Sequence, residues 1–172
     1  MPLYTGTTPP KLELSYLIHP FETVFCEDYQ NNQGGFAPGY IISDHKVRFS
    51  NFDPKDNTVD YEDAGVSSST IGEGAFVSGS GNYFTAFFNT VGSALGISTK
   101  TALVISGIAI DGGIKNFHYA FVMVEKGDDP EGLLMKEGVY RIFKDSDGYS
   151  ELTDWVMHHR TCGVYGQRRL HE

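Results

Sequence analysis

The C-terminal end of the chain contains its densest group of metal-ligand residue types. Met157, His158, His159 and Cys162 lie close together, and His171 follows them. Imidazole and sulfur groups bind zinc and copper, but a closed site requires three or four ligands in a fixed geometry. Adjacent histidines project differently from one element, so this spacing does not supply that geometry. We therefore predict an ordinary chain end and no metal site.

Two acidic turns resemble calcium-binding loops in composition. They are Asp145-Ser-Asp-Gly and Asp53-Pro-Lys-Asp-Asn. The first has its glycine too early for the EF-hand pattern and lacks the distant bidentate glutamate. Aspartate and asparagine are also common in ordinary turns. We therefore predict two structural turns.

Four acidic residues are candidates for general acid–base catalysis, which uses carboxylates that flank a substrate. Asp60, Glu62, Asp63 and Glu73 cluster near a predicted connection, and clustered acids usually form a solvated surface. The chain has no Gly-x-Ser-x-Gly elbow, His-Glu-x-x-His pair, phosphate loop or dinucleotide fingerprint. We therefore predict a protein that is not an enzyme and has neither catalytic residues nor a cofactor.

Aromatic side chains alternate along two predicted strands. Because alternate residues of a strand point to the same side, each row shares one face. The rows are Phe84, Ala86 and Phe88, and then Phe117, Tyr119, Phe121 and Met123. These rows either fill a packed core or line an apolar cavity. A cavity of this kind with a polar anchor would suit a small amphipathic ligand. The candidate ligand-binding residues are Phe84, Phe88, Phe117, Tyr119, Phe121 and Arg141.

Short strands separated by glycine-rich turns must position these side chains. In the first part of the chain, alternation predicts strands over residues 11–18, prolonged by 21–26, then over 40–52 and, more weakly, 58–63. The run Ser67-Ser-Ser-Thr, with Gly65 and Gly72 beside it, indicates a flexible connection.

Two hairpins are the clearest pattern in the middle of the chain. Glycine accepts the positive φ angles that tight antiparallel turns require. One pair of strands, 73–78 and 82–91, flanks Gly79-Ser-Gly, and a second pair, 99–110 and 114–125, flanks Asp111-Gly-Gly.

The end of the pattern predicts one more strand, over 138–144, and a short helix over 150–159 with Ser150 as its cap. The result is an all-β fold of about eight antiparallel strands in a meander that closes into a barrel, with a short C-terminal helix. A β-sandwich is the alternative.

The chain of 172 residues has the size of one domain. We expect a flexible tether over residues 1–10, a single β domain over 11–159 and a C-terminal tail over 160–172. The excess of 22 acidic over 13 basic residues gives a net charge of -9, which argues against binding to nucleic acid.

No apolar run is long enough for a transmembrane helix. The first residues lack the pattern of an export signal, so either no signal exists or it has been removed. Cys26 and Cys162 would pair in an oxidising compartment and remain thiols in a reducing one. The sequence leaves the oligomeric state open.

A meander of eight strands followed by one helix resembles the lipocalin-like, or calycin, barrels. The runs Gly79-Ser-Gly-Asn-Tyr-Phe-Thr and Thr101-Ala-Leu-Val-Ile-Ser-Gly are similar to segments of bacterial secreted lipoproteins with such domains. The opening Leu3-Tyr-Thr-Gly-Thr-Thr-Pro-Pro resembles the tether behind their lipid-bearing cysteine. The resemblance implies a non-enzymatic protein of the cell envelope or the extracellular space, lipid-anchored before trimming. On this resemblance, we expect the protein to bind a small apolar or amphipathic ligand in the barrel or to have only a structural role. A glycan-binding or adhesion module is the alternative for a sandwich.

Overall fold

The computed structural model describes residues 1–155, which form one β-sheet and, within that part of the chain, a single short helix. The prediction of an all-β fold is confirmed. The strands are β1 (Thr7–Thr8), β2 (Leu14–Ile18), β3 (Phe21–Cys26), β4 (Ile41–Ile42), β5 (His45–Asp53), β6 (Thr58–Ala64), β7 (Ser68–Ser80), β8 (Tyr83–Ala94), β9 (Ile97–Ile110), β10 (Gly113–Lys126), β11 (Tyr140–Asp145) and β12 (Tyr149–Leu152), and the helix is α1 (Glu27–Gln30).

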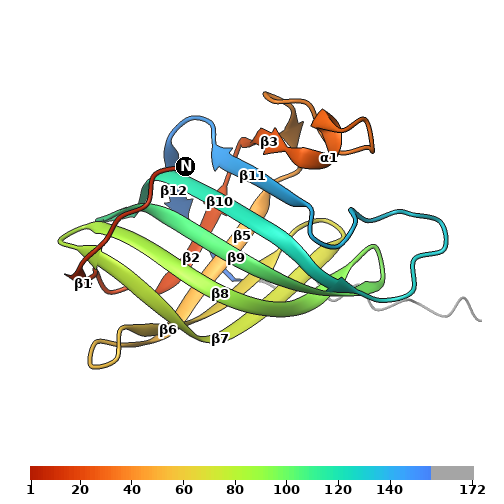
Figure 1. The fold of residues 1–172 in the computed structure, drawn as a ribbon. Coiled ribbons are helices and arrows are strands. Elements are labelled where there is room, and N and C mark those ends of the chain that lie inside the picture. Colours follow the sequence, from red (N-terminus) through yellow and green to blue (C-terminus); the bar gives the residue numbers. More distant parts are fainter. Residues whose placement is uncertain (156–172) are drawn as a thin grey trace, which may run out of the picture.

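The antiparallel pairing closes a ring of eight strands. Its order is β2, β5, β6, β7, β8, β9, β10 and β12, and β12 pairs again with β2. The long strand β10 has two neighbours on one side, because its first residues pair with β12 and its later residues with β11. From β11 the sheet continues to β3 and β4. Figure 1 shows β7 to β10 side by side, with β2 and β5 behind them.

The single sheet bears on the predicted alternative of a β-sandwich. All strands of residues 1–155 belong to the same hydrogen-bonded sheet. Two separate stacked sheets, the predicted alternative, are therefore not the arrangement of this part of the chain.

Both predicted central hairpins are confirmed. In the first hairpin, Gly79 and Ser80 still pair with Phe84 and Tyr83, so the turn lies at Gly81-Asn82 and not at Gly79. In the second hairpin, β9 and β10 join at Asp111-Gly112. Gly81 and Gly112 have φ angles of 61° and 84°, which glycine adopts without steric cost.

The interior of the ring holds the core. The predicted inward rows are confirmed, since Phe84, Ala86, Phe88, Phe117, Tyr119 and Met123 are buried and Phe121 packs against the same cluster. From the other side of the ring, β5 and β6 bury alternate residues that meet these rows. They are Val47, Phe49, Val59 and Tyr61.

The predicted flexible connection at Ser67-Ser-Ser-Thr is wrong. Strand β7 begins at Ser68, and Ser69 pairs with Ala64 on one side and with Ser93 on the other. Hydrogen bonding to two neighbours makes this segment a strand despite its polar composition. Gly72 and Gly74 lie at a break in the register between Ile71 and Phe76, which is typical of a bulge.

The start of the predicted C-terminal helix is also wrong. Ser150 and Glu151 belong to β12 and pair with Ile114 and Gly113 of β10, which closes the ring. Ring closure provides strand partners on both sides, so pairing outweighs the helical spacing of the apolar residues. Residues 156–159 and the predicted tail 160–172 lie outside the described residues.

Residues 1–10, predicted as a tether, contact the sheet. Thr7 and Thr8 form β1 and pair in parallel with Gly79 and Ser80. The backbone N–H of Tyr4 donates a hydrogen bond to the Thr85 hydroxyl at 2.7 Å. Within residues 1–155, no helix has the length and apolar character required to cross a bilayer.

Candidate ligand-binding cavity

A cavity of about 510 Å³ lies at one end of the ring. Its walls come from the first residues of β5, β7 and β9 and from the last residues of β6 and β8. The later half of β10 and the first half of β11 complete the wall, and the loops 31–40 and 127–139 extend it outward. This is the end of the ring at which α1 and the long loop between β10 and β11 lie (Figure 1).

The structure brings half of the predicted ligand-binding residues to this cavity. Tyr119, Phe121 and Arg141 line it. The other three belong to the packed core and do not line the cavity, since they lie deeper in the ring. They are Phe84, Phe88 and Phe117. One part of the aromatic rows therefore lines a cavity, and the other part fills the packed core.

Asp63 forms the polar centre of the cavity floor. It is the third inward residue of β6, after Val59 and Tyr61, and its side chain is almost fully buried. Its Oδ2 atom accepts hydrogen bonds from the Tyr61 hydroxyl at 2.8 Å and the Tyr119 hydroxyl at 3.0 Å. The expectation that this acid belongs to a solvated surface is wrong for Asp63, because strand alternation points it inward.

The other acids of the cluster have different positions. Glu62 points to the outer side of β6 and forms an ion pair with Arg48. Asp60 accepts hydrogen bonds from the Asn51 amide and from the backbone N–H of Gly74. Glu73 lies exposed on β7. Only Asp63 of this cluster therefore reaches the cavity.

The surroundings of Asp63 set its charge. Burial alone would raise the pKa of the carboxyl, but the charge of His45 and the hydrogen bond from Tyr61 lower the pKa of Asp63 below its usual range. Burial and the neighbouring carboxylate raise the pKa values of Tyr61 and Tyr119 well above the ordinary value. At neutral pH the floor therefore holds one carboxylate and two neutral tyrosine hydroxyl groups.

His45 lies beside this carboxylate. Its Nε2 atom is buried and lies 3.6 Å from Asp63 Oδ2, which is an ion-pair distance when the imidazole is protonated. The ring stacks on Phe21 with centroids 5.1 Å apart and meets the edge of Tyr119 at 5.6 Å. A Cβ atom at Gly65 would lie 3.2 Å from His45 Nδ1 and 2.8 Å from the Ser68 hydroxyl. Nδ1 is therefore the ring nitrogen that lies toward Gly65, which lines the cavity together with Ser68.

Arg141 has an internal partner at the rim. Its guanidinium group binds Asp28 of α1 and lies 5.3 Å above the ring of Phe36. Asp28 is buried, so this ion pair fastens α1 and the loop 31–40 to β11. Arg141 therefore lines the cavity as part of an ion pair with Asp28. The sequence alone predicted it as a polar anchor for a ligand.

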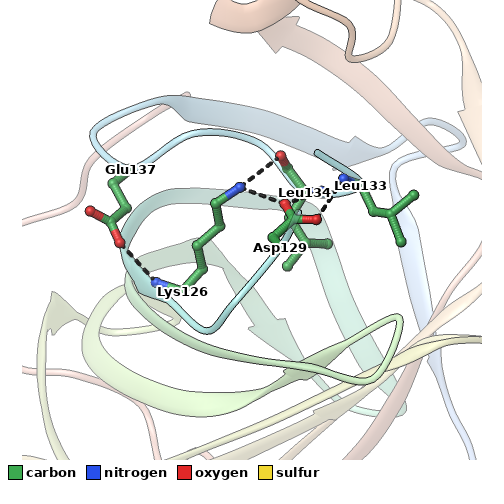
Figure 2. A network of polar contacts seen from close by, with 5 residues as sticks. All are labelled: Lys126, Asp129, Leu133, Leu134 and Glu137. Atoms are coloured by element: carbon green, nitrogen blue, oxygen red, sulfur yellow. Dashed lines mark hydrogen bonds and ion pairs between the residues drawn. The ribbon is translucent and has the colours of Figure 1, made fainter. Parts of the chain in front are cut away.

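The loop 127–139 covers one side of the cavity, and a polar network fixes its shape (Figure 2). Asp129 accepts hydrogen bonds from the Lys126 ammonium at 2.6 Å and from the backbone N–H groups of Leu133 and Leu134 at 2.8 and 3.1 Å. Glu137 accepts a bond from the backbone N–H of Lys126 at 3.1 Å. The bond from Lys126 and the two backbone bonds lower the pKa of Asp129 to about 2. This network holds Leu133, Leu134 and Met135 against the cavity.

Sequence reasoning missed His45 and assigned Asp63 to a solvated acidic surface. A usable signal was present, because His45 continues the inward alternation of Val47 and Phe49, and Asp63 continues that of Val59 and Tyr61. Polar residues that keep the inward phase of a strand are candidates for a buried site.

Within residues 1–155, no group of three or more histidine, cysteine or acidic side chains is placed to hold a metal ion. The predicted end of the chain with His158, His159 and Cys162 lies outside the described residues. Cys26 is buried, and burial raises the pKa of its thiol. No family model, curated protein or solved structure matches this chain.

Proposed function

We propose that the protein binds a small amphipathic molecule in the cavity at the end of the ring. The observation that carries this proposal is the combination of apolar walls with a fixed polar floor. Phe21, Phe121 and Met123 supply apolar surface, and Asp63 with His45 supplies polar groups at the bottom. A volume of about 510 Å³ falls within the range of typical small-molecule sites.

The rim supports the same function. Val66, Leu95 and Leu133 line the cavity and are 80%, 53% and 53% exposed. Leu95 also adopts a φ of 52° in the turn between β8 and β9, a conformation that disfavours large side chains. Apolar side chains grouped in solvent around an opening are typical of a surface that an apolar ligand covers.

Fluorescence titration with N-phenyl-1-naphthylamine tests the proposal. This neutral aromatic amine brightens in apolar surroundings, and we expect one saturable site per chain. The variant Ala94→Trp places a large side chain on the cavity wall and should weaken binding by at least about tenfold, the effect of a 1.4 kcal/mol loss.

The matched control is Ala102→Trp, which carries the same substitution on β9 at a position outside the cavity wall. It should bind as the unmodified protein does, and thermal melts should show that both variants fold. Absence of saturable binding to the unmodified protein would contradict the proposal, as would equal binding by both variants.

We further propose that the ring is a lipocalin-like barrel and that the protein acts in the cell envelope or outside the cell. The ring of eight strands with a cavity at one end supports the first part, since small closed barrels hold ligands in this way. The location follows from the sequence resemblance, and fractionation of the native host with an antibody against the protein tests it.

A further inference from the structure

Two observations define the chemistry of His45. One ring nitrogen, Nε2, faces the Asp63 carboxylate at 3.6 Å, and the other, Nδ1, lies toward Gly65, a residue of the cavity lining. The two residues come from adjacent strands, β5 and β6, where Val47 is the register partner of Asp63. The sheet therefore fixes the imidazole and the carboxylate relative to each other.

The carboxylate determines which nitrogen carries the proton of the neutral imidazole. An ionised carboxylate only accepts hydrogen bonds, so a lone pair on Nε2 would face the lone pairs of Asp63 Oδ2. The tautomer with the proton on Nε2 is therefore favoured, and the lone pair lies on Nδ1. An imidazole with one nitrogen beside a carboxylate and the other near a binding site has the arrangement of a general base.

We propose that His45 is a catalytic general base that removes a proton from a carbon acid bound in the cavity, with Asp63 as its positioning residue. The substrate class is a small, mainly apolar molecule with a C–H bond next to a carbonyl or similar electron-withdrawing group. This proposal rests on the binding function proposed above and goes beyond the expectation of a non-enzymatic protein, which depended on contiguous sequence motifs.

The proton transfer requires no further reactant. The C–H bond breaks, its proton forms an N–H bond at His45 Nδ1, and the electron pair delocalises onto the electron-withdrawing group of the substrate. The imidazolium, paired with Asp63, then returns the proton to another atom of the substrate or to water. The hydroxyl groups of Ser68, Thr99 and Thr101 line the same cavity and can donate hydrogen bonds to the developing negative charge.

5-Nitrobenzisoxazole is a suitable probe, because a base removes its C–H proton and the N–O bond opens to a coloured phenolate. We expect the protein to accelerate this reaction. The titratable groups beside the imidazole are Asp63 on β6 and Tyr119 on β10, and the Tyr61 hydroxyl bonds to the same carboxylate. The Asp63 carboxylate is ionised and both tyrosines are neutral at neutral pH.

The variant His45→Gln should lose roughly 10²- to 10⁴-fold in rate, the usual contribution of a general base. The matched control is His118→Gln, because His118 lies on β10 outside the cavity wall and should leave the rate unchanged. In Asp63→Asn we expect kcat to fall by at least about tenfold, and by clearly more than the affinity for the inert analogue 6-nitrobenzotriazole falls. A merely structural role would change binding and kcat together.

Calorimetric titration with the inert analogue separates the two proposals. If the analogue binds and the probe is turned over at the same rate by His45→Gln and the unmodified protein, the base assignment is wrong and the binding function stands. If the analogue does not bind to the unmodified protein, the binding function fails and the base assignment fails with it. Should His45→Gln not fold, the same comparison with His45→Asn decides the assignment, and a rate equal to that of the unmodified protein would overturn it.

Discussion

Gly35 packs its backbone directly against the side chain of Asp28. A Cβ atom at position 35 would lie 2.5 Å from Asp28 Oδ1, and Gly35 has a φ of 81°. The contact lies under the ion pair of Asp28 with Arg141 at the cavity rim. The chain therefore needs glycine here both for its backbone conformation and for space.

We predict that Gly35→Ala lowers the free energy of unfolding by more than about 1 to 3 kcal/mol, the usual cost of a strained backbone conformation, because the collision adds to that strain. Gly34→Ala is the matched control, since Gly34 has a φ of 103° but no atom near its Cβ position. Chemical denaturation measures both, and equal losses would contradict the role of the Asp28 contact.

The two faces of β8 provide a second prediction. Phe84 is fully buried, whereas Phe87 is 43% exposed on the outer face opposite Phe76. Phe84→Ala should destabilise the fold by about 3 to 5 kcal/mol, and Phe87→Ala by less than about 1 kcal/mol. Denaturant melts of the two variants test this, and similar losses would show that the ring interior is assigned to the wrong face.

Asp145 gives a prediction about pH. Burial raises the pKa of this carboxyl to about 6, although Ser150 donates a hydrogen bond to it at 2.7 Å. Because the pKa is raised, the folded state keeps a proton at pH values where the unfolded state has lost it. The stabilisation from this group is therefore complete at low pH and is lost as the pH rises through the pKa of the folded state. Its contribution to stability should therefore fall as the pH rises from about 4 to about 6.

Thermal melts across that pH range test the expectation. Asp145→Asn removes the titration and should flatten the curve of melting temperature against pH. Asp111→Asn, in the exposed turn between β9 and β10, is the matched control and should follow the unmodified protein. A curve for Asp145→Asn that parallels that of the unmodified protein would contradict the assignment.

The loop 127–139 depends on Asp129. In Asp129→Asn one oxygen becomes an N–H donor, so the side chain loses its charge toward Lys126 and can no longer accept both backbone bonds. We expect faster hydrogen exchange at the amides of Leu133 and Leu134, measured by NMR. Because the pKa of Asp129 is lowered to about 2, protection in the unmodified protein should persist below pH 4 and be lost as the pH falls through about 2.

Asp128→Asn controls for the change of charge, because Asp128 is exposed one residue earlier in the same loop. It should leave the protection of both amides unchanged. Protected amides in Asp129→Asn would show that apolar contacts of Leu134 and Met135, and not the network in Figure 2, hold the loop.

Local patterns predicted the strands and hairpins well, because alternation and turn glycines act within a few residues. The aromatic rows around Phe84 and Phe117 could be assigned to one face for the same reason. Pairing between distant segments could not be predicted in this way. Ser69 is in a strand because of its two neighbours, and Ser150 because β10 and β2 require a strand between them.

In the candidate site, too, local patterns predicted some residues, whereas others depend on contacts between distant segments. Tyr119 and Phe121 were predicted from the alternation of one strand and do line the cavity. His45 and Asp63 come together only through the pairing of β5 with β6. Arg141, predicted as a polar anchor for a ligand, lines the cavity, and its pairing with Asp28 depends on α1, which no local pattern indicated.

The pairing of β12 with β2 has a kinetic consequence. These strands come from opposite ends of the described chain, so the ring cannot close until a ribosome has released nearly all of it. Proteins dominated by contacts between distant segments fold slowly, because chain entropy is lost before those contacts form. The hairpins β7–β8 and β9–β10 can assemble early as an open sheet with unpaired edges. During synthesis this open sheet is the species most exposed to aggregation.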